Sequence, residues 1–111
     1  MANDLNNVIL VGRITAEIEL AYTPSGAAYS NFSLAVNRKY NDKEEVSFIN
    51  CTSWNKTAEI MSQYCKKGSQ VAVSGELIQD RWEKDGQKQS KIKVVVRNVQ
   101  FLSTKDGGKD D

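Results

Sequence analysis

Apolar residues recur at every second position over most of this 111-residue chain, and at helical spacing in one stretch alone. A period of two predicts β-strands, because successive side chains of a strand point to opposite faces, whereas spacings of three and four predict a helix. The sequence therefore predicts an all-β fold with a single helix between strands 3 and 4. The expected strands are residues 5–14, 32–36, 46–56, 71–77 and 91–102, and the expected helix is residues 55–67.

This order of elements is that of an OB-fold, a five-stranded Greek-key barrel. Gly75 interrupts the fourth strand at a point where a small barrel has to bend sharply. The pair Asp85-Gly86 predicts a tight hairpin between the last two strands, and residues 41–45 are expected to be a short polar loop. A sandwich with one helix would fit the same elements nearly as well.

The composition argues against several classes of function. The chain has no histidine, which removes a Ser–His–Asp triad, a Cys–His pair and the commonest metal ligand. No grouped carboxylates indicate acid–base chemistry, so the sequence predicts neither an enzyme nor a metal or cofactor. Cys51 and Cys65 are expected to be buried thiols in a reducing compartment. The N-terminus does not resemble a secretory signal and no apolar run approaches the ~18 residues of a membrane span, so a cytoplasmic protein is expected.

The charge of the chain is close to balanced. The formal net charge is +1 at pH 7, far from the strongly basic composition that marks many nucleic-acid-binding domains. Any site for a polyanion must therefore arise from the distribution of the charges. Residues 1–104 are expected to form one domain, and residues 105–111 a disordered polar tail.

The expected third strand carries its largest apolar side chains on its polar face. Alternation turns Ile49 and Cys51 toward the core and leaves two aromatic residues, Phe48 and Trp54, on the same side as Asn50 and Thr52. A strand with one buried face normally keeps large apolar side chains out of its polar face. A ligand with flat rings would explain this arrangement.

Two further aromatic residues, Tyr40 and Trp82, also lie among charged residues at strand ends. The four exposed aromatics could pack together as a small surface cluster, but each stands within two residues of Lys, Arg or Asn. Exposed rings with interleaved cations are typical of sequence-tolerant single-strand sites, where bases stack on the rings. Phe32, Phe101 and Tyr64 are instead expected in the core.

Several segments resemble the bacterial single-stranded-DNA-binding protein family. They are VILVGRI, YTPSG, SFINCTSW and, most specifically, YCKKGSQVAVSGEL followed by DRW, within a similarity that runs over residues 3–102. The resemblance implies an OB-fold that protects single-stranded DNA in replication, recombination and repair. It also implies a homotetramer, a dimer of dimers with the first strand at an interface, which would explain why residues 5–14 are apolar on both faces.

The resemblance carries over to individual residues of this chain. Four aromatic residues match the family's stacking positions: Tyr40, Phe48, Trp54 and Trp82. Basic residues are expected to contact phosphates, with less specific support: Arg13, Arg38, Lys39, Lys56, Lys66, Lys67, Arg81 and Lys84. Asp80 stands where an arginine is common in the family, which is expected to weaken phosphate contact there.

Two departures from the family pattern qualify the expected partners. The loop at residues 41–45 is shorter than is usual in the family. The family's long tail, whose acidic tip recruits replication and repair enzymes, is missing from the sequence, so recruitment of these enzymes is not expected.

An alternative function is that of an OB-fold protein-interaction subunit of a primosome-like assembly. The exposed aromatics would then be the hot spot of a protein interface.

Overall fold

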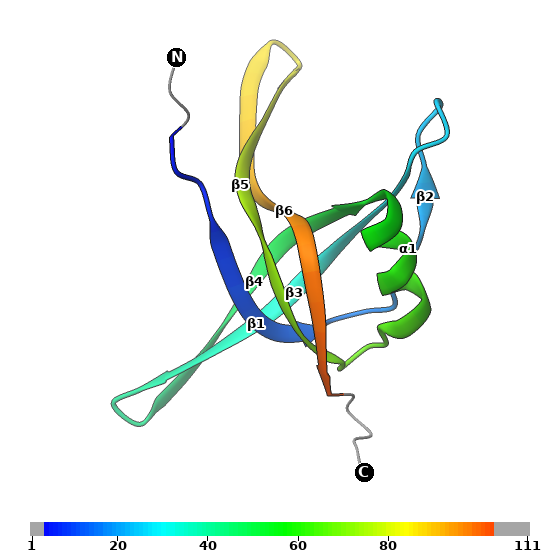
Figure 1. Cartoon of the computed structure of the whole chain (residues 1–111). Coiled ribbons are helices and arrows are strands. Elements are labelled where there is room, and N and C mark those ends of the chain that lie inside the picture. The colour runs from blue at the N-terminus through cyan, green and yellow to red at the C-terminus, as the bar shows by residue number, and fades with distance from the viewer. Residues whose placement is uncertain (1–3, 104–111) are drawn as a thin grey trace.

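The chain folds into a β-barrel with one helix packed against it, seen in Figure 1. The computed structural model describes residues 4–103. The elements in chain order are β1 (Val8–Ile14), β2 (Ala21–Tyr22), β3 (Ala28–Tyr40), β4 (Lys43–Trp54), α1 (Asn55–Tyr64), β5 (Gln70–Lys84) and β6 (Gln87–Ser103).

Pairing between β1 and β3 closes the sheet into a barrel. The sheet order is β1-β5-β6-β4-β3-β2, with β1 also joined to β3 through Arg13–Ala35 and Ile14–Leu34. All neighbours are antiparallel except β4 and β6, which run parallel. The two-residue β2 pairs with β3 alone, so five strands form the barrel and α1 connects the third of these to the fourth. The predicted OB-fold is confirmed, and the closing β1–β3 pairs rule out an open sandwich.

The barrel interior contains the apolar side chains that the alternating pattern predicts on the inner faces of the strands. Its buried centre includes Leu34, Met61, Val71, Val73 and Val94, with Met61 supplied by α1. Burying side chains of this size stabilises the fold by roughly 1.5–3 kcal/mol each. The helix therefore covers one end of the barrel with its own apolar stripe.

The barrel closes tightly at Gly75, where a β-bulge shifts the register between β5 and β6. A Cβ atom at this position would overlap the carbonyl oxygen of Val95 on the neighbouring strand. Only glycine allows the two backbones to approach this closely, so the sharp bend predicted at Gly75 is confirmed.

Two long hairpins, β3–β4 and β5–β6, extend away from the barrel in Figure 1. Both end in two-residue turns with positive φ: 48° and 64° at Asn41 and Asp42, and 54° and 79° at Asp85 and Gly86. These angles match the type I′ turns of tight hairpins. The Asp-Gly hairpin is confirmed, but the polar loop predicted at residues 41–45 spans only residues 41–42. Asn and Asp tolerate positive φ, so the turn needs two residues and β4 already begins at Lys43.

Two side chains predicted in the core lie on the surface. Tyr64 is 62% exposed and Phe101 is 44% exposed, and their ring centroids are 5.9 Å apart. The helix α1 ends at Tyr64, three residues earlier than predicted, and Cys65 directly after it is buried in place of Tyr64. Phe101 pairs with Val71 near the end of β6, and its ring lies against that of Tyr64 instead of in the core. Phe32 packs against the core as predicted.

No helix within residues 4–103 is long and apolar enough to cross a membrane. The predicted tail at residues 105–111 lies outside the described residues.

Candidate nucleic-acid interface

The outward face of β4 presents the two aromatic residues noted in the sequence. Phe48 is 63% exposed and Trp54 is 38% exposed, whereas Cys51 is buried and Ile49 packs against the core. The predicted alternation of β4 is therefore confirmed for these four side chains. Thr52 shares the outward face, but its predicted exposure is wrong: it is buried, and its hydroxyl donates a hydrogen bond to Oδ1 of Asn31, 2.7 Å away.

Strand register brings Trp82 to the same face of the sheet. Thr52 of β4 pairs with Val95 of β6, which pairs with Glu76 of β5. Paired residues point to one side of a sheet, as do residues two apart in one strand. Counting along β5 from Glu76 leads to Trp82 on that side, without a further shift in register. We call the surface that carries Phe48, Trp54 and Trp82 the aromatic face.

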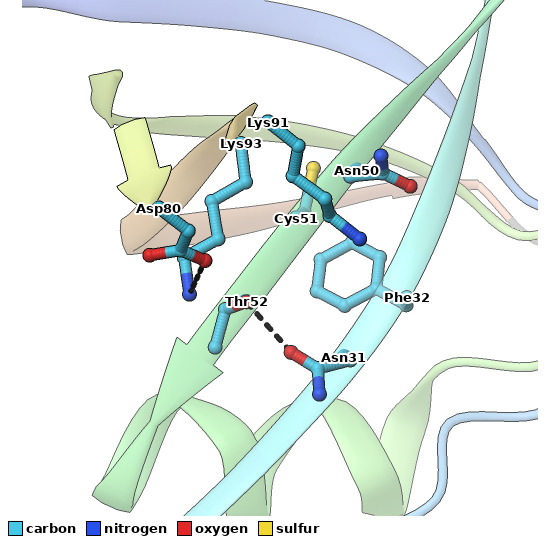
Figure 2. A pocket seen from close by; sticks show the side chains of 8 residues that line it. All are labelled: Asn31, Phe32, Asn50, Cys51, Thr52, Asp80, Lys91 and Lys93. Atoms are coloured by element: carbon cyan, nitrogen blue, oxygen red, sulfur yellow. Dashed lines mark hydrogen bonds and ion pairs between the residues drawn. The ribbon is translucent and has the colours of Figure 1, made fainter. Parts of the chain in front are cut away.

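A polar cavity opens on this face between the strands (Figure 2). Its volume is about 390 Å³, and β3 and β4 line one side while the β5–β6 hairpin lines the other. The lining side chains are Asn31, Phe32, Asn50, Cys51, Thr52, Asp80, Lys91 and Lys93. The aromatic residues are thus joined by a surface that offers amides, a hydroxyl and two ammonium groups.

A tyrosine that the sequence left unassigned extends the aromatic face. The ring of Tyr29 on β3 lies 5.3 Å from that of Trp54, with the planes tilted by 35°. Tyr29 and Trp54 are also paired across β3 and β4, so their side chains project on the same side. Their contact restricts the motion of the Trp54 ring, which reduces the entropy lost when a ligand binds on it.

The fourth predicted stacking residue, Tyr40, does not share the aromatic face. Tyr40 pairs with Lys43 and therefore projects from the opposite side of the β3–β4 hairpin to Phe48. Its hydroxyl donates to Oε2 of Glu45 at 3.3 Å, and the guanidinium carbon of Arg38 lies 4.4 Å from the ring centroid. Its 38% exposed ring is held at the edge of the hairpin, apart from the other three.

The eight predicted cations are dispersed, and none of them lines the cavity. By register, Lys39 and Lys84 project on the aromatic face, whereas Arg38 and Arg81 project on the opposite one. Two of the arginines already donate to acceptors within the chain: Arg13 to the Gly68 carbonyl oxygen at 2.9 Å, and Arg81 to Gln79 Oε1 at 2.7 Å. The remaining three are exposed at the ends of α1 or directly after it: Lys56, Lys66 and Lys67.

Two lysines that the sequence reasoning missed lie on this face. Lys91 and Lys93 precede the valine run of β6 and line the cavity (Figure 2). The signal was present in the alternation of KIKVVV: if Val94 is buried, Lys93 and Lys91 fall on the opposite, outward side. The valines alone predict a core strand, so the polar side of the segment does not by itself indicate a site.

Both cysteines are buried free thiols, as predicted. Burial raises the pKa of Cys51 to about 12 and that of Cys65 to about 11, because the charged thiolate is poorly solvated inside the protein. Cys51 borders the cavity but stays protonated at neutral pH. It therefore contributes an apolar wall and no nucleophile.

Comparison with known proteins places this geometry in a family. A family model described as the single-strand binding protein family matches residues 5–102. The chain belongs to this family. It is 47% identical over 109 residues to the single-stranded DNA-binding protein of Treponema pallidum (strain Nichols), covering 95% of this chain and 62% of that protein. It is 41% identical over 106 residues to single-stranded DNA-binding protein 1 of Streptococcus pyogenes, covering 92% of this chain and 82% of that protein.

A solved structure supports the fold of this family member independently. The structure titled "Plasmodium falciparum SSB complex with ssDNA" superposes with a TM-score of 0.84, over 93% of this chain and 99% of that one, at 22% identity. The chain spans a little under two thirds of some of its relatives, as with 63% of single-stranded DNA-binding protein A of Bacillus subtilis (strain 168), which is 44% identical over 108 residues.

Proposed function

We propose that this protein binds single-stranded DNA without strong sequence preference, by stacking bases on the aromatic face and contacting phosphates with lysines. The observation that carries the proposal is the convergence of Phe48, Trp54 and Trp82 on one side of the sheet. Their spacing along two strands, β4 and β5, suits successive bases of a flexible single strand, whereas a duplex hides its base faces in the stack. Proteins of the same family are named for this activity.

Stacking on an aromatic ring contributes roughly 1–3 kcal/mol per base and accepts any base, because every base has a flat π-face. The lysines on this face supply the part of the affinity that depends on phosphates. Lys39, Lys84 and Lys91 are exposed there, in addition to Lys93 at the cavity. Such a binder has no catalytic step and acts wherever replication, recombination or repair exposes single strands, which in a bacterium is the cytoplasmic nucleoid.

Fluorescence anisotropy of labelled oligo-dT tests this proposal. We expect saturable binding. The logarithm of the binding constant should fall linearly with the logarithm of the salt concentration, because each phosphate neutralised on a single strand releases about 0.7 of a counterion. An unlabelled duplex of equal length should compete poorly. Equal competition by the duplex, or no binding of oligo-dT at low salt, would show that the aromatic face serves another partner, such as a protein.

We further propose that the active form is a homotetramer, a dimer of dimers with β1 at an interface. The outward side chains Ile9 and Val11 lie two residues apart on one face of β1 and are 69% and 47% exposed, so together they form an apolar patch on this strand. Within residues 4–103, the stretch Val8–Val11 pairs with β5 on one side and has no strand on the other. A second copy of the chain could add its own β1 to this edge and cover the apolar side chains.

Replacing Ile9 by Glu is expected to break this assembly. The carboxylate would have to be desolvated at the interface, so light scattering should show the mass falling from about four chains to one or two at micromolar concentration. Ile92→Glu is the matched control, since Ile92 is also an exposed strand isoleucine (54%) but lies on the β5–β6 hairpin away from β1. If the unsubstituted protein is a stable monomer, or if both variants dissociate alike, β1 is not the interface.

A further inference from the structure

The cavity on the aromatic face contains an ion pair that the proposed function does not use. Nζ of Lys93 lies 3.1 Å from Oδ2 of Asp80, on the neighbouring strand (Figure 2). The Lys93 side chain is 19% exposed and that of Asp80 is 43% exposed. Lys91 lines the same cavity, and among the described residues it forms no ion pair. One of the two ammonium groups at the cavity is thus neutralised within the protein.

We infer that this cavity is a subsite for one backbone phosphate of the DNA, and that Asp80 masks it by holding Lys93 until the phosphate displaces the carboxylate. The inference rests on the proposed binding of single-stranded DNA. It assigns Lys91 and Lys93 as the phosphate ligands of the subsite, and Asp80 as the group that limits the affinity.

The shape and chemistry of the cavity suit a phosphodiester. Two ammonium groups on the same strand, two residues apart, project on one side and can hold one anion between them. Oδ1 of Asn31 accepts the hydrogen bond from Thr52, so the amide NH₂ of Asn31 remains to donate to a phosphate oxygen. The flanking rings of Trp54 and Trp82 would hold the adjoining bases, which places a phosphate of the connecting backbone between them.

The internal ion pair changes how this subsite responds to salt. A phosphate that binds to a free lysine releases counterions from the DNA, and this release makes the affinity fall as salt rises. A phosphate that takes Lys93 from Asp80 also frees a carboxylate, which attracts a cation from solution and cancels part of the release. The carboxylate then repels the phosphate nearby. Asp80 therefore lowers both the affinity and its dependence on salt.

The test compares Asp80→Asn with the unsubstituted chain by oligo-dT anisotropy over a series of salt concentrations. We expect Asp80→Asn to bind about two- to fivefold more tightly at low salt, within the range of an ion pair that is partly exposed. The slope of log K against log salt should steepen by up to about 0.7, the value of one full phosphate contact on a single strand. Asp80→Ser is a second variant with the same expectation, should the asparagine variant not fold.

Glu76→Gln is the matched control. Glu76 lies on the same strand and the same side as Asp80 and pairs with Arg97 at 2.8 Å, but neither residue lines the cavity. Glu76→Gln removes one negative charge, as Asp80→Asn does. We expect the affinity of Glu76→Gln for oligo-dT to stay within about twofold of that of the unsubstituted protein. Adding Lys93→Gln to Asp80→Asn should abolish the gain, because the gain requires a freed Lys93.

The outcomes separate this inference from the proposed function. If the unsubstituted protein binds oligo-dT but Asp80→Asn leaves affinity and salt slope unchanged, or Glu76→Gln produces an equal gain, the masked subsite is wrong and the single-strand binding stands. If the unsubstituted protein does not bind oligo-dT at all, both are wrong.

Discussion

Replacing Trp54 by Ala is expected to weaken the binding of oligo-dT by about 5- to 150-fold, which corresponds to the loss of one stacked base at roughly 1–3 kcal/mol. The ring is 38% exposed on the aromatic face, and the centroid of the Tyr29 ring lies 5.3 Å from its own. This contact fixes the orientation of the Trp54 ring while its other side stays accessible to a base. The melting temperature should fall by only a few degrees, because the ring is not part of the buried core. Anisotropy titration and a thermal melt on the same sample measure both effects.

Tyr64→Ala is the matched control for this change. Tyr64 is also an exposed aromatic residue in contact with one other ring, that of Phe101 at 5.9 Å, but it belongs to α1 and not to the aromatic face. We expect its melting temperature to change about as much as that of Trp54→Ala while its affinity for oligo-dT stays the same. If Trp54→Ala keeps its full affinity and only the melting temperature falls, then the Trp54 ring is structural and the stacking assignment is wrong.

Replacing Gly75 by Ala is expected to have the largest effect on stability, a loss of about 3 kcal/mol or more. The added Cβ would overlap the backbone oxygen of Val95, and a backbone atom cannot move aside by changing rotamer. Domains of this size are stable by roughly 5–15 kcal/mol in total, so the melting temperature should fall by more than about 12 °C. Melts followed by circular dichroism at one fixed protein concentration measure the loss, since assembly also affects stability.

Gly86→Ala is the matched control, because it has the cost of an unfavourable backbone angle without a steric overlap of the added Cβ atom. Gly86 has φ of +79° in the β5–β6 turn, but a Cβ atom there would meet nothing within 4 Å. The alanine variant should therefore lose only about 1 kcal/mol, from the positive φ alone. A Gly75→Ala protein as stable as Gly86→Ala would mean that β5 and β6 can separate at the bulge, contrary to the tight closure described above.

The sequence predicted the elements of this fold because local patterns decide them. Alternation identified the barrel strands, Asp85-Gly86 identified a hairpin, and Gly75 identified the bend. It could not show how far the hairpins extend, because pairing beyond the barrel depends on the partner strand and not on burial. Lys43 begins β4 by pairing with Tyr40, although its segment reads as a polar loop.

The composition of the site was harder to predict than its aromatic residues. Phe48 and Trp54 could be predicted as site residues because they are aromatic residues on the polar side of an alternating strand. Trp82 could be predicted because it lies among charged residues. Which face each ring occupies depends on the register between strands far apart in the sequence, and this register separates Tyr40 from the other three. The same pairing creates the cavity with Lys91 and Lys93, which no single segment reveals.

The central claim is that bases stack on the aromatic face, and tryptophan emission tests it most directly. The chain has two tryptophans, Trp54 and Trp82, and both lie on that face, so the emission reports on no other region. Titration with oligo-dT should quench it strongly and to saturation, while heparin, a polyanion without bases, should leave it nearly unchanged. Emission that stays constant while anisotropy shows oligo-dT bound would contradict stacking and leave a purely electrostatic contact.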